Sequence, residues 1–338
     1  MALTDKLKAI ADAIRAKIGG TDTMTLDDMP TAISNISGDV EPPYVKETYD
    51  ASGNLIAAEL VGMKNVRKKA FTDCATLKSV KLPPGLTSID GYAFAYCTGL
   101  GLFDFPSRIT SINGNAFVGC SSLTTTSLPS ALVSIGEYAF GNCRSLALTS
   151  LPSGVTNIGN NAFYYCKELA LTSLPSGIKN IGTNAFSDCE KLALTSLPSG
   201  LTIIDVGAFR YCSKITVTDL PPGVTKIDAY AFFHCSDLAI TSLPSGLTYI
   251  GDCAFRDCSK IAITRIPSGI TKILMQAFSA CVGLESLTFE GTPTLINSSA
   301  FQACKNLKTI NVPWAEGAVA NAPWGATNAT INYNYTGE

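Results

Sequence analysis

The chain has 338 residues, of which 46% are hydrophobic and 15% are charged, so it can bury a core and does not have the composition of a disordered protein. A formal net charge of −2 gives no electrostatic reason to expect a nucleic acid or an anionic membrane as a partner. No apolar run reaches the roughly 18 residues that a membrane-spanning helix needs, so we expect no membrane insertion.

The N-terminal segment predicts two short helices. Apolar residues recur every three or four positions over residues 3–18, which indicates an amphipathic helix, and Pro30 opens a second helix over residues 30–36. Helices this small bury little surface, so residues 1–36 are expected either to cap the following domain or to dock on a partner. This start carries charges throughout and lacks the apolar region of about 7–15 residues of a secretory signal, so we do not expect export by that route.

The next segments predict a linker and a β-hairpin. Residues 37–43 are rich in turn-forming residues and indicate a linker. Two β-rich runs then flank the turn-like residues 50–54, so residues 44–66 are expected to form a hairpin. The end of a repeat domain needs a cap, and we assign that role to the hairpin.

From residue 67 to residue 313 the phrase Ala-Phe-x-x-Cys recurs eleven times, and neighbouring copies lie 23 residues apart without insertion or deletion. A constant period of about 20–50 residues indicates a solenoid in which each unit packs only on its neighbours. We therefore predict a mainly β repeat solenoid. The repeated phenylalanines are Phe71, Phe94, Phe117, Phe140, Phe163, Phe186, Phe209, Phe232, Phe255, Phe278 and Phe301.

Within each repeat the spacing predicts one short helical turn and one strand. Phe163 and Cys166 are three residues apart, which places Ala, Phe and Cys on the inner face of a helical turn and the two x residues on its outer face. A strand such as residues 146–151 follows, and a Pro-Ser-Gly turn then reverses the chain.

The apolar positions of this strand differ along the array. Outer repeats place them at Leu77, Val80 and Leu82. Inner repeats place them at Leu169, Leu171 and Leu174. Because side chains alternate in a strand, we predict a backbone irregularity that changes position between the two types of repeat.

Eleven of the twelve cysteines occupy one repeat position, from Cys74 to Cys304. Stacked coils would place them about 4.8 Å apart with parallel side chains, whereas a disulfide needs Cβ atoms about 3.8 Å apart. We expect a ladder of buried free thiols, with disulfides or a metal site as the alternatives. Cys253 lies outside the ladder and is expected to be exposed.

The C-terminal residues 314–338 are expected to form a cap or tail. Two Pro-Trp pairs place Trp314 and Trp324 just after the last repeat. We predict that these rings cover the last coil, and the alternative is a ligand-stacking role.

The sequence gives little support for catalysis. His234 is the one histidine, and its neighbour Cys235 belongs to the ladder, so a Cys–His nucleophile pair is not expected. Neither a phosphate-binding loop nor a metal-ligand spacing is recognisable. We expect no enzyme activity, no cofactor and no metal.

The candidate ligand-binding residues are aromatic and arginine side chains at the outer x positions. Such side chains on a rigid edge are typical of surfaces that recognise protein or cell-surface glycan. The alternative is that the rings only pack over neighbouring repeats. These residues are Tyr96, Tyr164, Tyr165, Arg210, Tyr211, Phe233, His234 and Arg256.

The phrase Leu-Pro-x-Gly-[Val/Leu/Ile]-Thr-x-Ile-x-x-x-Ala-Phe-x-x-Cys-x-x-Leu resembles the BspA-like leucine-rich repeat family over residues 67–313. That resemblance implies a right-handed, curved coil with a parallel sheet. Many members are bacterial surface proteins that bind host components, although we recognise neither the export signal nor the wall-anchoring tail usual for such adhesins.

The flanking segments carry a second resemblance. Lys6-Leu-Lys-Ala-Ile-Ala-Asp-Ala-Ile-Arg15 and Leu26-Asp-Asp-Met-Pro-Thr-Ala-Ile33 are similar to the openings of tail-associated proteins of phages and prophages of gut Firmicutes. Tyr49-Asp-Ala-Ser-Gly-Asn-Leu55 and the tryptophan-containing tail are also similar to segments found there. A virion protein is assembled in the cytoplasm and needs no signal peptide.

Three functional hypotheses follow. The first is a non-enzymatic binding or structural component of a phage tail, which docks on other virion proteins through residues 3–36 and presents the solenoid to the bacterial envelope. The second is a bacterial surface or released adhesin that binds host protein or glycan. The third and weakest is a hydrolase on a repeat scaffold.

Overall fold

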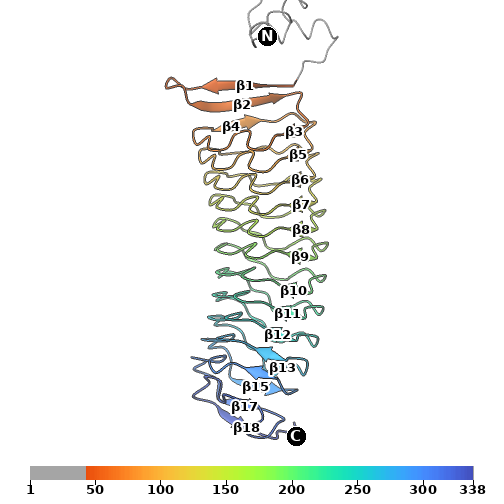
Figure 1. Cartoon of the computed structure of the whole chain (residues 1–338), viewed down its shortest axis with the longest axis vertical. Helices are drawn as coiled ribbons and strands as arrows, with labels where there is room; N and C mark the ends of the chain where they lie inside the picture. Colours follow the sequence, from red (N-terminus) through yellow and green to blue (C-terminus); the bar gives the residue numbers. More distant parts are fainter. Residues whose placement is uncertain (1–42, 338) are drawn as a thin grey trace, which may run out of the picture.

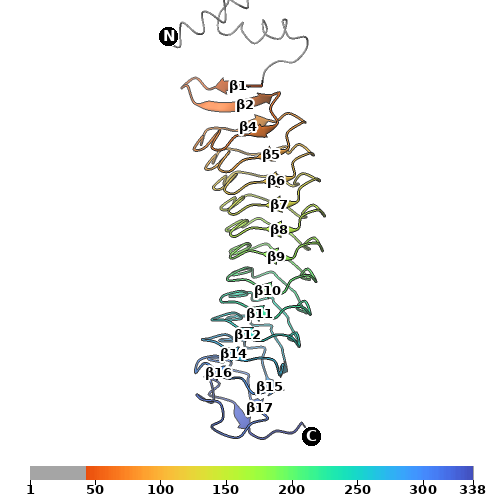
Figure 2. The ribbon, with the colours of Figure 1, turned by 45° about the vertical axis from the view of Figure 1, so that its right-hand side comes forward.

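The computed structural model describes residues 43–337. The helices expected over residues 3–18 and 30–36, and nearly all of the expected linker, lie outside these residues. The described chain is one long stack of coils, with a hairpin at one end and the C-terminus at the other (Figures 1 and 2). We number the coils 1 to 11 by their phenylalanines, from Phe71 to Phe301.

An antiparallel hairpin covers the N-terminal end of the stack. Strands β1 (Tyr44–Tyr49) and β2 (Leu55–Val61) pair with each other, and β2 also pairs in parallel with β4 (Ser79–Lys81) of coil 1. The hairpin therefore occupies the hydrogen-bonding edge that coil 1 would otherwise expose.

A ladder of very short parallel strands runs along one side of the solenoid. Each strand pairs with the strand 23 residues later and buries an Ile or Val side chain. The ladder is interrupted once, between β9 and β10, which gives a six-stranded and a five-stranded sheet. The first contains β3 (Asn65–Val66), β5 (Ser88–Ile89), β6 (Ser111–Ile112), β7 (Ser134–Ile135), β8 (Asn157–Ile158) and β9 (Asn180–Ile181), and the second contains β10 (Ile203–Ile204), β11 (Lys226–Ile227), β12 (Tyr249–Ile250), β14 (Lys272–Ile273) and β16 (Leu295–Ile296).

The segment that the sequence predicts as the strand is paired only near the two ends of the stack. In addition to β4, these strands are β13 (Arg265–Ile266), β15 (Ser286–Phe289) and β17 (Thr309–Asn311). Strand β18 (Thr330–Asn332) of the C-terminal tail pairs with β17 and ends this sheet. In the inner coils the prediction is wrong, because residues 146–151 form no strand. A single bond, from Ala170 N–H to the Leu148 carbonyl at 3.0 Å, joins this segment to the next coil.

The predicted change in the backbone irregularity is confirmed by burial. In coil 1 two consecutive residues, Lys78 and Ser79, are exposed at the start of the segment, and strand β4 begins at the second of them. In coil 5 the exposed pair is Thr172 and Ser173, in the middle of the segment. A pair of outward residues in the middle breaks the alternation of side chains, which explains why the inner coils form no ladder there.

The Ala-Phe-x-x-Cys segments are not helical, so the predicted helical turn is wrong. Tyr164 N–H bonds to the Asn161 carbonyl three residues back at 3.0 Å, whereas Phe163 N–H and Tyr165 N–H bond to the next coil, both at 2.8 Å. Asn161 and Tyr165 have φ angles of 55° and 61°, in the left-handed region. This backbone turns every second N–H toward the next coil, so the segment is a series of tight turns and no i→i−4 bond can form.

The repeated Phe and Cys side chains form the continuous interior that the sequence predicts. Successive phenylalanine rings are stacked with centroids 5.2–5.7 Å apart and planes within 15° of parallel. All twelve cysteines are free thiols. Each ladder thiol from Cys97 to Cys304 donates to the carbonyl of the phenylalanine in the preceding coil, at 2.9–3.1 Å.

Cys253 is buried, with 3% of its surface exposed, so the expectation that it is exposed is wrong. It occupies the position of Asn161 in its coil, and its Sγ lies 3.7 Å from Gln276 Oε1 of the next coil. The side chains of the following coil therefore cover it.

The two tryptophans close the C-terminal end, as predicted. Trp314 and Trp324 are 6% and 0% exposed, with ring centroids 6.2 Å apart, and both rings contact Phe289. The Phe301 backbone N–H also donates a hydrogen bond to the Trp324 backbone carbonyl at 2.9 Å. The two rings thus cover the end of the core, where a further coil would otherwise pack. Because both rings are buried, neither has a free face on which a ligand could stack.

The thiol ladder should be chemically inert in the folded protein. Burial raises the pKa of the Cys97 and Cys304 thiols to about 12, which lowers the fraction of reactive thiolate at neutral pH. With an aromatic disulfide reagent we expect at most one thiol to react in the native chain, the half-buried Cys74. All twelve should react in denaturant. Rapid native reaction of several thiols that persists in a Cys74→Ser variant would contradict the ladder.

The phenylalanine stack should dominate stability. Phe186 is fully buried between rings at 5.5 Å and 5.7 Å, so Phe186→Ala should cost about 3–5 kcal/mol in urea denaturation. The exposed Thr195 is the control, and Thr195→Ala should change the free energy by no more than about 0.5 kcal/mol. Equal unfolding midpoints for the two variants would show that the stack is not the core.

Candidate binding ridge

The x residues of the Ala-Phe-x-x-Cys turns form two parallel rows along the solenoid, which we call the ridge. The first x residue follows the buried Phe, and the second precedes the buried Cys and has a left-handed backbone in every coil. The N–H of each second x residue in coils 1 to 10 bonds to the carbonyl of the first x residue in the next coil, for example Tyr165 N–H to Ser187 O at 2.8 Å, so hydrogen bonds join the two rows from coil to coil.

The predicted site residues fall into three separate groups on this ridge. Tyr96 of coil 2 is 51% exposed and lies over Gly119 of coil 3, where an added Cβ would come within 2.6 Å of the Tyr96 ring. Tyr164 and Tyr165 of coil 5 form a second pair, 5.9 Å apart. Five residues from coils 7 to 9 form the third group: Arg210, Tyr211, Phe233, His234 and Arg256.

The third group is a continuous cluster. Tyr211 and His234 are stacked with centroids 5.1 Å apart, and Phe233 meets both of them edge-on, at 5.3 Å and 4.4 Å. Tyr230 adds a fourth ring, 5.7 Å from Phe233. We call these six residues, Arg210, Tyr211, Tyr230, Phe233, His234 and Arg256, the Arg–aromatic cluster.

Two positions in the cluster differ from the sequence prediction. Phe233 is only 8% exposed, because it lies beneath Tyr211 and His234, so it supports the surface and is not displayed on it. Tyr230 was missed, because the prediction considered only the x positions. It directly precedes the Ala-Phe pair, as Tyr92 and Tyr138 do, and that recurrence was the available signal.

Arg210 is held by aromatic rings. Its guanidinium carbon lies 5.0 Å from the Tyr211 ring centroid, 5.5 Å from Phe233 and 5.6 Å from Tyr230. Its Nε is buried and has no hydrogen-bond partner within residues 43–337. Cation–π attraction therefore orients this cation.

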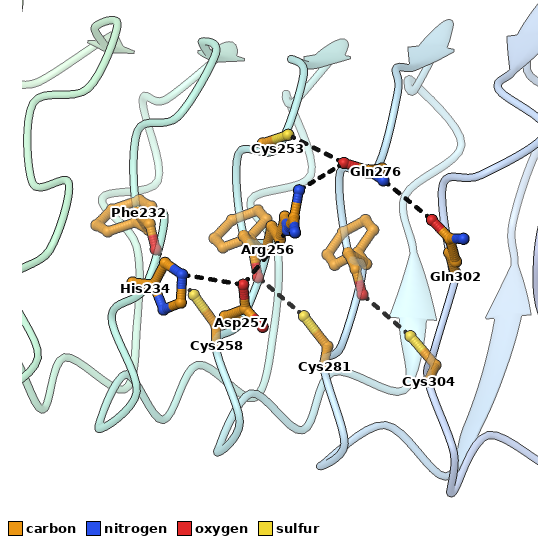
Figure 3. A network of polar contacts seen from close by, with 12 residues as sticks. Phe232, His234, Cys253, Arg256, Asp257, Cys258, Gln276, Cys281, Gln302 and Cys304 are labelled. Carbon is orange, nitrogen blue, oxygen red and sulfur yellow. Dashed lines mark hydrogen bonds and ion pairs between the residues drawn. The ribbon is translucent and has the colours of Figure 1, made fainter.

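Polar contacts within coil 9 and between neighbouring coils hold Arg256 and His234 (Figure 3). His234 Nε2 lies 3.2 Å and Arg256 Nε lies 3.4 Å from Asp257 Oδ2. Arg256 Nη1 donates to Gln276 Oε1 at 2.7 Å, and Gln276 Nε2 donates to Gln302 Oε1 at 3.0 Å. These contacts fix both side chains along the solenoid.

Several cluster residues carry backbone strain. Tyr211, Tyr230 and His234 have φ angles of 58°, 59° and 58°, a region that costs a non-glycine residue about 1–2 kcal/mol. The second x position is left-handed in every coil, and other coils place Tyr96, Tyr165, Ala, Asp, Gly119 or Asn142 there. Of these residue types, Gly and Asn adopt this backbone most readily. The strain therefore belongs to the repeat and is shared by rings outside the cluster.

The surroundings of His234 do not resemble a nucleophile pair. The Cys235 thiol donates to the Phe209 carbonyl at 3.0 Å in the core, so it points away from the exposed imidazole. Within residues 43–337 no three His, Cys, Asp or Glu side chains are grouped to hold a metal ion. No helix in that part of the chain is long and apolar enough to cross a bilayer.

A family model described as BspA type leucine rich repeat region, in six copies, matches residues 64–193, 112–239 and 225–317. The chain belongs to the BspA-type leucine-rich repeat family. Solenoids of this family are generally binding scaffolds without enzyme activity. Among curated proteins, none matches the chain.

Solved structures similar to this BspA-type chain include several bacterial leucine-rich repeat proteins. The pneumococcal vaccine antigen PcpA shares 18% identity over 85% of this chain and 82% of its own, with a TM-score of 0.53, which shows a common fold. A leucine-rich cell surface protein of Faecalibacterium prausnitzii A2-165 shares 24% over 89% of this chain and 97% of its own (TM-score 0.48). The T. pallidum leucine-rich repeat protein shares 28% over 51% and 88% (TM-score 0.42).

The cluster should contribute little to stability. In a Tyr211→Asn/His234→Asn variant, relief of two strained backbone positions should offset the loss of the ring contacts, so the free energy of unfolding should change by no more than about 1 kcal/mol. Urea denaturation measures this. Gly207→Ala is a contrasting variant at φ 59°, where an added Cβ would lie 2.1 Å from Asn184 Oδ1, and it should be clearly destabilised. A double Asn variant as unstable as Gly207→Ala would assign the rings a structural role.

Proposed function

We propose that this BspA-type solenoid is a non-enzymatic binding protein and that the Arg–aromatic cluster of coils 7 to 9 is its recognition surface. The observation that carries the proposal is the contact network of the cluster, in which four rings and two arginines from three successive coils touch one another.

The composition and rigidity of the cluster support the same proposal. Tyr and Arg are enriched among the residues that dominate binding energy at interfaces. Both arginines are already oriented, Arg210 by three rings and Arg256 by Asp257 and Gln276, so little side-chain entropy is lost when a partner binds. Tyr96 and the Tyr164–Tyr165 pair stand apart from this cluster and remain secondary candidates.

For the place of action we propose a phage or prophage tail. Support comes from the resemblance of the first 36 residues to the openings of tail-associated proteins, which would let them dock on other virion proteins while the solenoid faces the bacterial envelope. The alternative is a bacterial surface or released adhesin, which the BspA-type repeats support equally.

Binding should depend on the cluster and leave the fold intact. The variant Arg210→Gln/Tyr211→Asn/His234→Asn in the full chain should bind intact bacteria at least about tenfold more weakly than wild type, because hot-spot residues contribute about 2 kcal/mol or more each. Cell pull-down with labelled protein measures this. The matched control is Glu168→Gln/Lys191→Gln on coils 5 and 6, which removes one surface ion pair. Equal binding by all three proteins would overturn the proposed surface.

The place of action needs a separate experiment. Electron microscopy of particles from the source strain with an antibody to this chain should show labelled tails. Label on the cell surface with unlabelled particles would favour the adhesin instead.

A further inference from the structure

The charge along the ridge is concentrated on coils 7 to 9. We consider in each coil the two x residues, the Cys and the two residues after it, which in coils 7 to 9 are residues 210–214, 233–237 and 256–260. These residues include four cations and two carboxylates, a formal charge of +2, whereas the whole chain has a net charge of −2. The equivalent residues of coils 4 to 6 sum to zero, those of coils 1 to 3 to −1, and those of coils 10 and 11 to +1. Three of the seven Tyr and His residues that have a left-handed backbone within residues 43–337, Tyr211, Tyr230 and His234, lie on these positively charged coils, and they are the ones that contact one another through Phe233.

The outward atoms of the cluster are hydrogen-bond donors. The faces of the Tyr211 and His234 rings are turned toward each other, and the Arg210 guanidinium also lies against Tyr211, so these faces are not free to stack on a sugar or a base. Asp257 pairs with one edge of Arg256 and with His234, so the groups that can still donate to a ligand are the other guanidinium N–H groups and the tyrosine hydroxyls. Such a surface favours oxyanions.

The cations repeat along the solenoid axis. Arg210 and Arg256 belong to coils 7 and 9, two coils or about 10 Å apart. Lys214 and Lys260 repeat with the same separation beside them, and both lie near Asp237, at 3.7 Å and 2.6 Å. A linear ligand with regularly repeated charges matches this geometry better than the irregular surface of a folded protein.

We propose that the cluster binds an anionic polysaccharide or polyol-phosphate chain laid along the ridge, with its carboxylate or phosphate groups at Arg210 and Arg256. This inference rests on the proposed binding function and names its ligand class. A charge-assisted, bidentate contact to each guanidinium would supply most of the affinity.

The test uses the full chain and four probes in titration calorimetry. The probes are polyglycerol phosphate, polygalacturonate, neutral dextran and poly-L-glutamate. We expect binding of one or both anionic polymers, weakened by added NaCl, and no binding of dextran. Arg256→Gln should lower the affinity about tenfold, whereas Lys191→Gln on the neutral coils should leave it unchanged.

The outcomes separate this inference from the proposed function. A preference for the phosphate or the carboxylate polymer identifies the source of the anion, and either supports the inference. Equal binding of dextran, tighter binding of polyglutamate than of either polymer, or no binding of both polymers overturns it. The proposed function depends only on whether the triple cluster variant loses binding to cells.

Discussion

The structure depends on the carbonyl group of the repeated phenylalanine. Phe140 O accepts the N–H of Cys143 in its own turn at 3.1 Å and the thiol of Cys166 in the next coil at 3.0 Å, so both lone pairs are used. One bond closes the turn and the other fixes the position of the next coil. Because the same pair of bonds recurs from Phe71 to Phe278, each coil must place its Cys at the same point, which explains a period of 23 residues without any insertion.

The same constraint shapes the ridge. The phenylalanine carbonyl can accept the thiol of the next coil only if the backbone around it turns sharply, and the left-handed residues at both ends of the segment produce that turn. The second x residue is therefore fixed between two coils, and its side chain leaves the surface in a direction set by the core. A binding residue at this position is oriented before any ligand arrives.

The core and the end caps could be predicted from the sequence, but the local backbone could not. A fixed period and one-sided Phe and Cys positions are sufficient to place those side chains inside. A spacing of three and four residues, however, fits a helical turn and a series of tight turns equally well, and a tyrosine gives no sign that its φ is positive. In the inner coils the sequence also predicts the strand in the wrong segment, residues 146–151. The strand that forms instead, β8, has only two residues, which is too short to show an alternation of apolar and polar side chains.

The site was predictable only at the level of single positions. Residue types at the x positions identified Arg210, Tyr211, His234 and Arg256, but the burial of Phe233 and the contribution of Tyr230 depend on how adjacent coils overlap. That overlap links residues about 23 apart, which no local pattern reveals.

A repeat protein provides its own reference for such surface features. Every coil holds its second x residue in the same left-handed backbone, and Tyr96, Gly119, Asn142 and Tyr165 occupy that position in other coils. The backbone alone therefore does not distinguish coils 7 to 9. These coils differ because their rings contact one another and two arginines, and because their outer residues carry a formal charge of +2. The core does not require charge at these outer positions, so we attribute the combination to ligand binding.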